Sequence, residues 1–271
     1  MTGSAEVKPS YRHVIAATDG SQLSGIALLG GALLAAKTSA RLHVFHAASG
    51  PDSEAAAMAQ AAAVLQDRPY ELVVRDLMTS ASRTIAEYAK EIGEPAIVAI
   101  GTRGRGGVGS SLLGSTAADL VARAGQTILA YGPGAGNPMG IERVVACVDG
   151  TEFSELSVTE GLRWATALDV PLWLIQVVPP NLPPSVSVFE STYVHNLARE
   201  LRGLSTQVEW EVLHSTTPAQ SIVEMHGNDA ATMLVMATHG RVGLERVLLG
   251  SVSSQVVREA WGPVALVRPK E

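Results

Sequence analysis

An internal repeat constrains the fold of this chain more than any other feature. Residues 12–24, RHVIAATDGSQLS, and residues 143–154, RVVACVDGTEFS, each hold a β-branched apolar run, an Asp-Gly pair and a helix start. Toward the end of each half, residues 101–125 align without gaps to residues 237–261, with ten identical positions. Each copy therefore reads as one structural unit. We expect two tandem domains, residues 1–134 and 140–271, joined by the Gly- and Pro-rich segment YGPGAGNPMG.

The second copy is longer than the first. The offset between the copies is 130 at Asp19 and Asp149 but 136 at Gly104 and Gly240, so six residues are added between the two repeated segments. We place them in the Pro-rich segment 178–185, VPPNLPPS. Its residues 179–184 are expected to be a plain loop; the alternative is a cover for the ligand side of the second domain.

Strand and helix patterns alternate within each copy. Hydrophobic residues make up 46% of the chain and aromatic residues only 4%, which suits a sheet covered by Ala-rich helices. Alternating βαβ units predict an α/β fold with two tandem doubly wound domains. Each domain is a five-stranded parallel sheet of order 3-2-1-4-5 flanked by helices. The expected strands are 13–18, 41–47, 70–77, 96–101 and 126–131, then 143–148, 171–178, 207–214, 232–237 and 263–268.

The strand order indicates where a ligand would bind. In open parallel sheets, ligands lie outside the carboxyl ends of the strands, where the strand order reverses. That point falls between the first and fourth strands, which carry the repeated segments. Asp19 and Gly101 should therefore face one crevice in the first domain, and Asp149 and Ala237 a matching crevice in the second.

The residues at this crevice suit a nucleotide. Gly101 and Gly104 allow the backbone to approach a ligand, because no Cβ intrudes. Gly114 and Ser115 begin the next helix, whose free N–H groups favour an anion. Asp19 is an acceptor for an exocyclic amine or a ribose hydroxyl. The alternative is that Asp19 caps the first helix and the glycines form turns.

The pattern Gly101-x2-Gly104-x9-Gly114-Ser115, after a first strand that ends in Asp, resembles the ATP-binding signature of universal stress proteins. The resemblance covers nearly the whole chain, as two domains in tandem. It implies a role in stress or dormancy responses, ATP as the ligand, with or without Mg²⁺, and frequent pairing through the fifth strand. By this resemblance, the contacts would come from Ala17, Thr18, Asp19, Ala47, Ile100, Gly101, Gly104, Gly114, Ser115 and Thr116 in the first domain, and from Cys147, Val148, Asp149, Val177, Met236, Ala237, Gly240, Gly250, Ser251 and Val252 in the second.

The second copy departs from the signature at two positions. Ala237 replaces the first glycine, and Val252 stands where the first copy has Thr116. The second half also carries the whole acidic excess of the chain, with 9 basic and 15 acidic side chains. We therefore hypothesise weaker nucleotide binding at the second site.

The sequence predicts binding rather than catalysis. No Gly-Lys-Ser/Thr follows the glycines, so the usual phosphate lysine is missing, and there is no G-x-S-x-G motif. His43 and His46 lie three apart on a strand and point to opposite faces, so they cannot share a metal. Three functions stay open: a nucleotide-binding regulator, which the intact first copy favours, a ligand-free interaction scaffold, and an ATP-using enzyme; slow ATP hydrolysis is compatible with the first.

Charge and hydropathy limit the partners and location. The net charge of −6 argues against binding to nucleic acid or an anionic membrane. With one cysteine, no intramolecular disulfide can form. The start of the chain, MTGSAEVKPSYR, lacks the apolar region of a signal peptide, so we expect a cytoplasmic protein. The last strands, 126–131 and 263–268, are expected at sheet edges, where they can pair within the chain as a pseudo-dimer or with a second copy as a homodimer.

Overall fold

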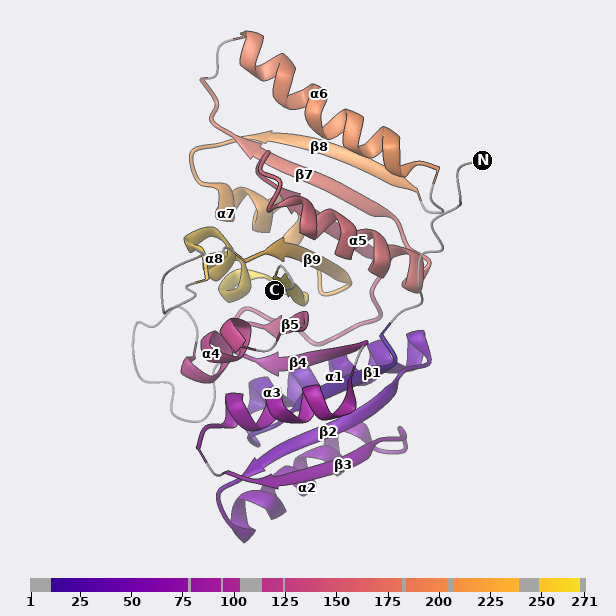
Figure 1. Ribbon diagram of the computed structural model, residues 1–271, viewed down its shortest axis with the longest axis vertical. Helices are drawn as coiled ribbons and strands as arrows, with labels where there is room; N and C mark the ends of the chain where they lie inside the picture. Colours follow the sequence, from indigo (N-terminus) through magenta and orange to yellow (C-terminus); the bar gives the residue numbers. More distant parts are fainter. Residues whose placement is uncertain are drawn as a thin grey trace.

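The computed structural model describes residues 11–77, 79–93, 95–102, 114–123, 125–181, 184–203, 207–238 and 249–268. Its strands form one ten-stranded sheet of order β3-β2-β1-β4-β5-β10-β9-β6-β7-β8. The first half has the order β3-β2-β1-β4-β5 and the second half the order β8-β7-β6-β9-β10. Both confirm the predicted 3-2-1-4-5 arrangement. The two halves are stacked along the long axis of the molecule, with β5 near their junction (Figure 1).

The elements alternate as the sequence predicts. The first half contains β1 (His13–Ala17), α1 (Gln22–Thr38), β2 (Arg41–Ala48), α2 (Pro51–Leu65), β3 (Glu71–Asp76), α3 (Ala81–Ile92), β4 (Ala96–Gly101), α4 (Ser115–Arg123) and β5 (Ile128–Tyr131). The second contains β6 (Arg143–Val148), α5 (Glu155–Leu168), β7 (Leu172–Val178), α6 (Pro184–Leu201), β8 (Val208–His214), α7 (Pro218–Ile222), a π-helical turn (Val223–Gly227), β9 (Thr232–Ala237), α8 (Ser251–Glu259) and β10 (Val264–Val267).

The two halves join through their last strands. β5 and β10 pair antiparallel, with Ala130 opposite Val264, Leu129 opposite Ala265 and Ile128 opposite Leu266. Within each half the neighbouring strands are parallel. This is the pairing within the chain that the sequence allowed; pairing with a second copy stays a prediction.

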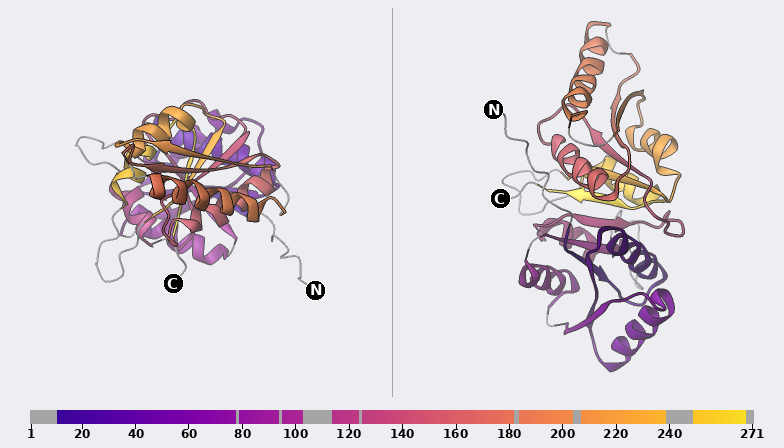
Figure 2. Two further views of the ribbon diagram at one scale, coloured as in Figure 1. Left: turned by 90° about the horizontal axis from the view of Figure 1, so that it is seen from above. Right: turned by 90° about the vertical axis from the view of Figure 1, so that its right-hand side faces the viewer.

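Each face of the sheet carries its own core, and each core runs through both halves. Val14 and Leu28 of the first half belong to the same cluster as Trp164 and Val194 of the second. That face is covered by α1, α2, α5 and α6. The opposite face is covered by α3, α4, α7 and α8, and its core includes Leu120. Figure 2 shows the helices on both sides of the sheet.

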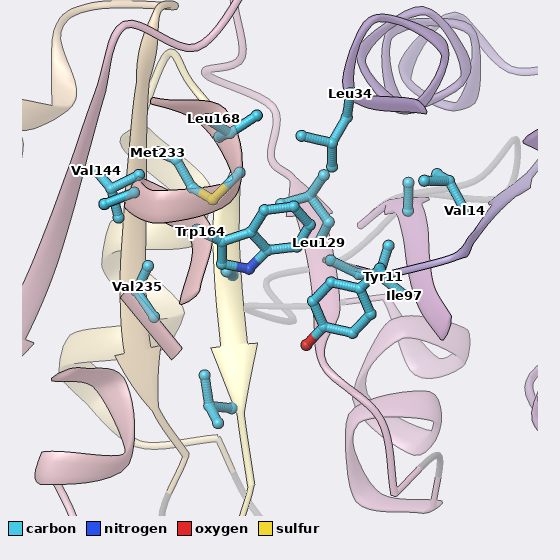
Figure 3. Close-up of a cluster of buried hydrophobic side chains, with 14 of the residues drawn as sticks. Tyr11, Val14, Leu34, Ile97, Leu129, Val144, Trp164, Leu168, Met233 and Val235 are labelled. Carbon is cyan, nitrogen blue, oxygen red and sulfur yellow. The ribbon is translucent and has the colours of Figure 1, made fainter. Parts of the chain in front are cut away.

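The core at the junction is centred on two aromatic rings. Trp164 of α5 is 1% exposed, and its ring stacks on that of Tyr11 with centroids 4.8 Å apart. Leu129 of β5 and Leu34 of α1 lie close to this pair (Figure 3). The hydroxyl of Tyr11 donates to the carboxylate of Glu160, which is 4% exposed. Side chains from both halves therefore fill one cluster.

The extra residues of the second copy are divided between a loop and a helix. The connection from β7 to α6 is three residues longer than that from β2 to α2, and α6 has 18 residues where α2 has 15. The expectation that residues 179–184 form a plain loop is therefore wrong at the last of these positions. Pro184 begins α6, because proline suits the first position of a helix, where no N–H is needed.

The described helices and metal-ligating side chains bear on membrane and metal binding. Among the described residues, no helix combines the length and apolar character needed to span a membrane. Within the same part of the chain, no three His, Cys, Asp or Glu side chains are grouped to hold a metal ion.

Candidate functional site

The candidates of the second copy surround one pocket. β6 and β9 are neighbours, and their carboxyl ends meet at the predicted reversal of strand order. A pocket with a volume of about 250 Å³ lies there. Every second-copy candidate lines it except Gly240, which lies outside the described residues. The lining residues are Cys147, Val148, Asp149, Ser154, Ile175, Val177, Pro218, Ile222, Met236, Ala237, Gly250, Ser251, Val252 and Ser253.

The pocket includes the start of a helix that has no side-chain cap. Gly250 is the N-cap residue of α8, and within the described part of the chain no side-chain hydrogen bond caps this helix. By contrast, Ser21 caps α1 and Ser80 caps α3 through their hydroxyl oxygens. Uncapped N–H groups and the positive end of the helix dipole suit an anion. A phosphate therefore fits the Gly250–Ser251 end of the pocket.

The two aspartates form turns and do not cap the helices. Asp149 Oδ1 accepts hydrogen bonds from Thr151 N at 3.0 Å and Thr151 Oγ1 at 2.6 Å. Asp19 Oδ1 accepts from Ser21 N at 3.0 Å. The N-cap residues of α1 and α5 are Ser21 and Ser154. Each aspartate is thus held at the carboxyl end of the central strand, one carboxylate oxygen shaping the turn.

Gly101 permits a close approach that the sequence did not reveal. A Cβ at this position would lie 2.8 Å from the carbonyl carbon of Leu23 and 2.9 Å from Ser24 N, both in the first turn of α1. Contacts this short to backbone atoms cannot be relieved by a side-chain rotation. The missing Cβ therefore lets α1 begin directly against β4, in addition to any room that it leaves for a ligand.

The start of α5 explains how the second copy accepts an alanine here. The equivalent of Gln22 is Glu152, yet α5 begins at Glu155, almost one turn later. Residues 151–154 form a turn instead, closed by a bond from Ser154 N to Thr151 O at 3.0 Å. Ala237 lines the pocket without closing it. Weaker binding at this site stays a prediction.

In the first copy, the candidates lie at matching positions. Ala17 and Asp19 end or follow β1, Ala47 lies near the end of β2, and Ile100 lies near the end of β4. The next group, Gly114, Ser115 and Thr116, forms the start of α4. Gly104 falls outside the described residues. The topology thus brings the described candidates of this copy to one edge of the sheet.

The structure also shows contacts that no motif indicated. The Gln60 side chain of α2 accepts hydrogen bonds from the hydroxyls of Thr18 and Ser24, the latter at 3.2 Å, and donates to Ser21 O at 2.7 Å. The Thr18 side chain is therefore turned toward the helices. In the second domain, Tyr193 of α6 donates to Glu155 Oε1 at 3.1 Å, at the start of α5. A single polar residue on a helix gives no periodic signal by which to find it.

The histidines of β2 are bonded within the fold. His46 Nδ1 lies 2.8 Å from Thr18 O, and His46 Nε2 lies 3.3 Å from Ser53 Oγ on the α2 side. His43 lies on the other face, 3.0 Å from the Tyr88 hydroxyl of α3. The prediction that the two rings point to opposite faces is confirmed. Burial lowers the pKa of His43, which favours its neutral form.

Cys147 offers a test of how closed the pocket wall is. Burial raises the pKa of its thiol to about 12. At pH 8 we therefore expect the folded protein to react with a disulfide reagent roughly 10³-fold more slowly than the urea-unfolded chain, because only the thiolate attacks. Equal labelling rates for the folded and unfolded chains would show that the thiol is open to solvent.

Comparison with known proteins places the chain in a family. The model of the universal stress protein family matches residues 10–131 and again residues 140–268. A universal stress protein of Mycolicibacterium smegmatis is 30% identical over 70% of this chain and 67% of its own length. Universal stress protein Rv2005c of Mycobacterium tuberculosis is 31% identical over 65% of this chain. The chain spans 62% of that relative's length.

Solved structures show the same fold. A universal stress protein from Archaeoglobus fulgidus superposes with a TM-score of 0.70 over 95% of this chain and 98% of its own, at 17% identity. A protein of unknown function from Pseudomonas aeruginosa gives a TM-score of 0.67 over 96% of this chain and 94% of its own, at 20% identity. Because the family model matches both halves, and both halves carry the repeated strand order, the chain belongs to the universal stress protein family.

Proposed function

We propose that this protein binds ATP at the reversal point of each half and acts in the cytoplasm as a nucleotide-dependent regulator of a stress or dormancy response. The pocket at the carboxyl ends of β6 and β9 carries the proposal, because it gathers all the described second-copy candidates. Its apolar wall suits a base. Its uncapped helix start, at Gly250, suits phosphate.

The protein is proposed to hold the nucleotide rather than to turn it over. The residues that would contact ATP in the second domain are apolar or small, apart from Asp149 and the serines Ser154, Ser251 and Ser253. Asp149 shapes its own turn through Oδ1. When bound with ATP, Mg²⁺ would offset phosphate charge; the chain itself supplies the helix N–H groups. The chain's own residues thus bind and orient the nucleotide.

The test is a count of bound nucleotides by calorimetry and native mass spectrometry. The unmodified chain is expected to bind two ATP molecules. Gly250→Asp is expected to bind one, because aspartate is a good N-cap and places its carboxylate where a phosphate would lie. The φ of −56° at Gly250 accepts this substitution without strain. Gly114→Asp is the matching change in the first domain.

Gly140→Asp is the matched control. It adds the same charge in the linker, where nothing lies within 4 Å of an added Cβ, and two ATP molecules should still bind. If neither the unmodified chain nor any of the variants binds ATP, the result would favour the ligand-free scaffold. Steady multiple-turnover cleavage of ATP, lost in Gly114→Asp or Gly250→Asp, would favour the enzyme.

A further inference from the structure

The first proposed site is bonded directly to the end of β5. Gly114, which precedes α4, donates its N–H to Thr102 O at 2.7 Å. Thr102 in turn donates its N–H to Tyr131 O at 2.9 Å, at the last residue of β5. Thr102 is 2% exposed, so both bonds are shielded from water. Thr102 therefore joins the start of α4, where the first site is proposed to bind phosphate, to the last residue of β5.

The residues that follow β5 pack against α8 of the other domain, the helix whose start is proposed to bind phosphate. Gly132 lies so close to α8 that an added Cβ would be 1.6 Å from Val257 O. Gly134 donates its N–H to Arg258 O at 2.9 Å. Both carbonyls belong to the last turn of α8, and the first residue of this helix, Ser251, lines the second pocket.

A second connection runs from the second site to the first. Thr238, directly after β9, donates its N–H to Val267 O at 2.8 Å. Arg268, which follows Val267, extends toward the first domain and donates through Nη1 to Val121 O at 3.3 Å and to Ala122 O. These carbonyls lie in the last turn of α4, whose first residue is Ser115 at the first site. The first connection thus runs from the start of α4 to the last turn of α8, and the second runs from the end of β9 to the last turn of α4. We call these two connections the crossed contacts.

We propose that the two nucleotide sites are coupled through these crossed contacts, so that ATP at one site raises the affinity of the other. The proposal rests on the proposed function, since it needs both sites to bind. Helices α4 and α8 have nine residues each and are short enough to move as rigid bodies. Each begins at one site, and its last turn contacts residues that follow the other domain's last strand. Ordering one site therefore lowers the cost of ordering the other.

The experiment compares stepwise binding constants. The association constant of the first site is measured in Gly250→Trp and that of the second in Gly114→Trp, each by calorimetry with ATP. The large uncharged side chain blocks one site without supplying the negative charge of a phosphate. The coupling factor is the overall two-ligand constant of the unmodified chain divided by the product of these two values. We expect a factor of about 5 or more.

Arg268 is the positioning residue to test. With Arg268→Ala added to all three proteins, the coupling factor should fall to within about twofold of one, because the bonds to the α4 carbonyls are lost. Arg123→Ala is the matched control, since Arg123 also lies in the last turn of α4 but pairs with Asp119 of the same helix. It should leave the factor unchanged. Arg268→Lys keeps a donor and a charge, so it should retain part of the coupling factor. It replaces Arg268→Ala in the comparison if the alanine variant folds poorly.

The outcomes separate this inference from the proposed function. If both single-site proteins bind ATP but the factor is near one, coupling is overturned and ATP binding stands. If only one of them binds, coupling between two nucleotide sites is also overturned. If none binds, the proposed function fails with it. A large factor that survives Arg268→Ala would show that the contact at α4 does not carry the coupling.

Discussion

Replacing Trp164 with alanine is expected to lower the free energy of unfolding by about 4 kcal/mol. The side chain is 1% exposed and stacks on Tyr11 at the junction of the two halves. Its removal leaves a cavity bordered by Leu129 and Leu168, which come from strand and helix elements that cannot collapse into it (Figure 3). Urea unfolding followed by circular dichroism measures the change.

Trp261→Ala is the matched control for this prediction. Trp261 is the second residue after α8 and is 51% exposed, so its loss should change the free energy of unfolding by no more than about 0.5 kcal/mol. Equal effects of the two substitutions would contradict the burial of Trp164. They would also remove the argument that the junction is a shared core.

Gly132→Ala is expected to cost about 3 kcal/mol or more in the free energy of unfolding. The added Cβ would lie 1.6 Å from Val257 O and 2.7 Å from the Val257 carbonyl carbon. Both are backbone atoms of a helix, so only a displacement of α8 relative to β5 relieves the overlap. Calorimetry should then show two separate transitions, one for each half, where the unmodified chain shows one.

Gly140→Ala provides the reference for that measurement. Gly140 lies in the same linker, and nothing is within 4 Å of an added Cβ. The substitution should leave the single transition in place and shift its midpoint little. If Gly132→Ala unfolds like Gly140→Ala, the close contact between the first domain and α8 is not a real constraint on the fold.

The strands and their order could be predicted because the pattern of burial is strong. Apart from His13 at the start of β1, β1 and β4 are apolar, as expected for central strands covered on both faces, and their residues are buried except at His13, Ala17 and Gly101. The repeat then placed Asp19 and Asp149 at equivalent ends of equivalent strands. The location of each candidate site followed from topology.

Other features depend on hydrogen bonds and packing contacts that the hydropathy pattern and the repeat do not encode. Glu160 lies on a helix, where a glutamate ordinarily faces solvent, yet it is 4% exposed and bonded to Tyr11, 149 positions away. A further difference between the copies is local: Thr151 O accepts the turn bond from Ser154 N, whereas the matching Ser21 O accepts the helical bond from Gly25 N, so α5 begins later than α1. The role of Gly101 against α1 likewise becomes visible only once α1 and β4 are packed together.

The antiparallel pairing of β5 and β10 has a consequence for how the two halves can diverge. The two copies meet about an approximate twofold axis between Leu129 and Ala265, which occupy the same position of the repeat. A strand paired with an identical strand about such an axis would set that position against itself, as two leucines or two alanines. Here a large side chain faces a small one. Covalent fusion makes this unequal pair accessible, and it leaves each half able to change its interface, and its pocket, without changing the other.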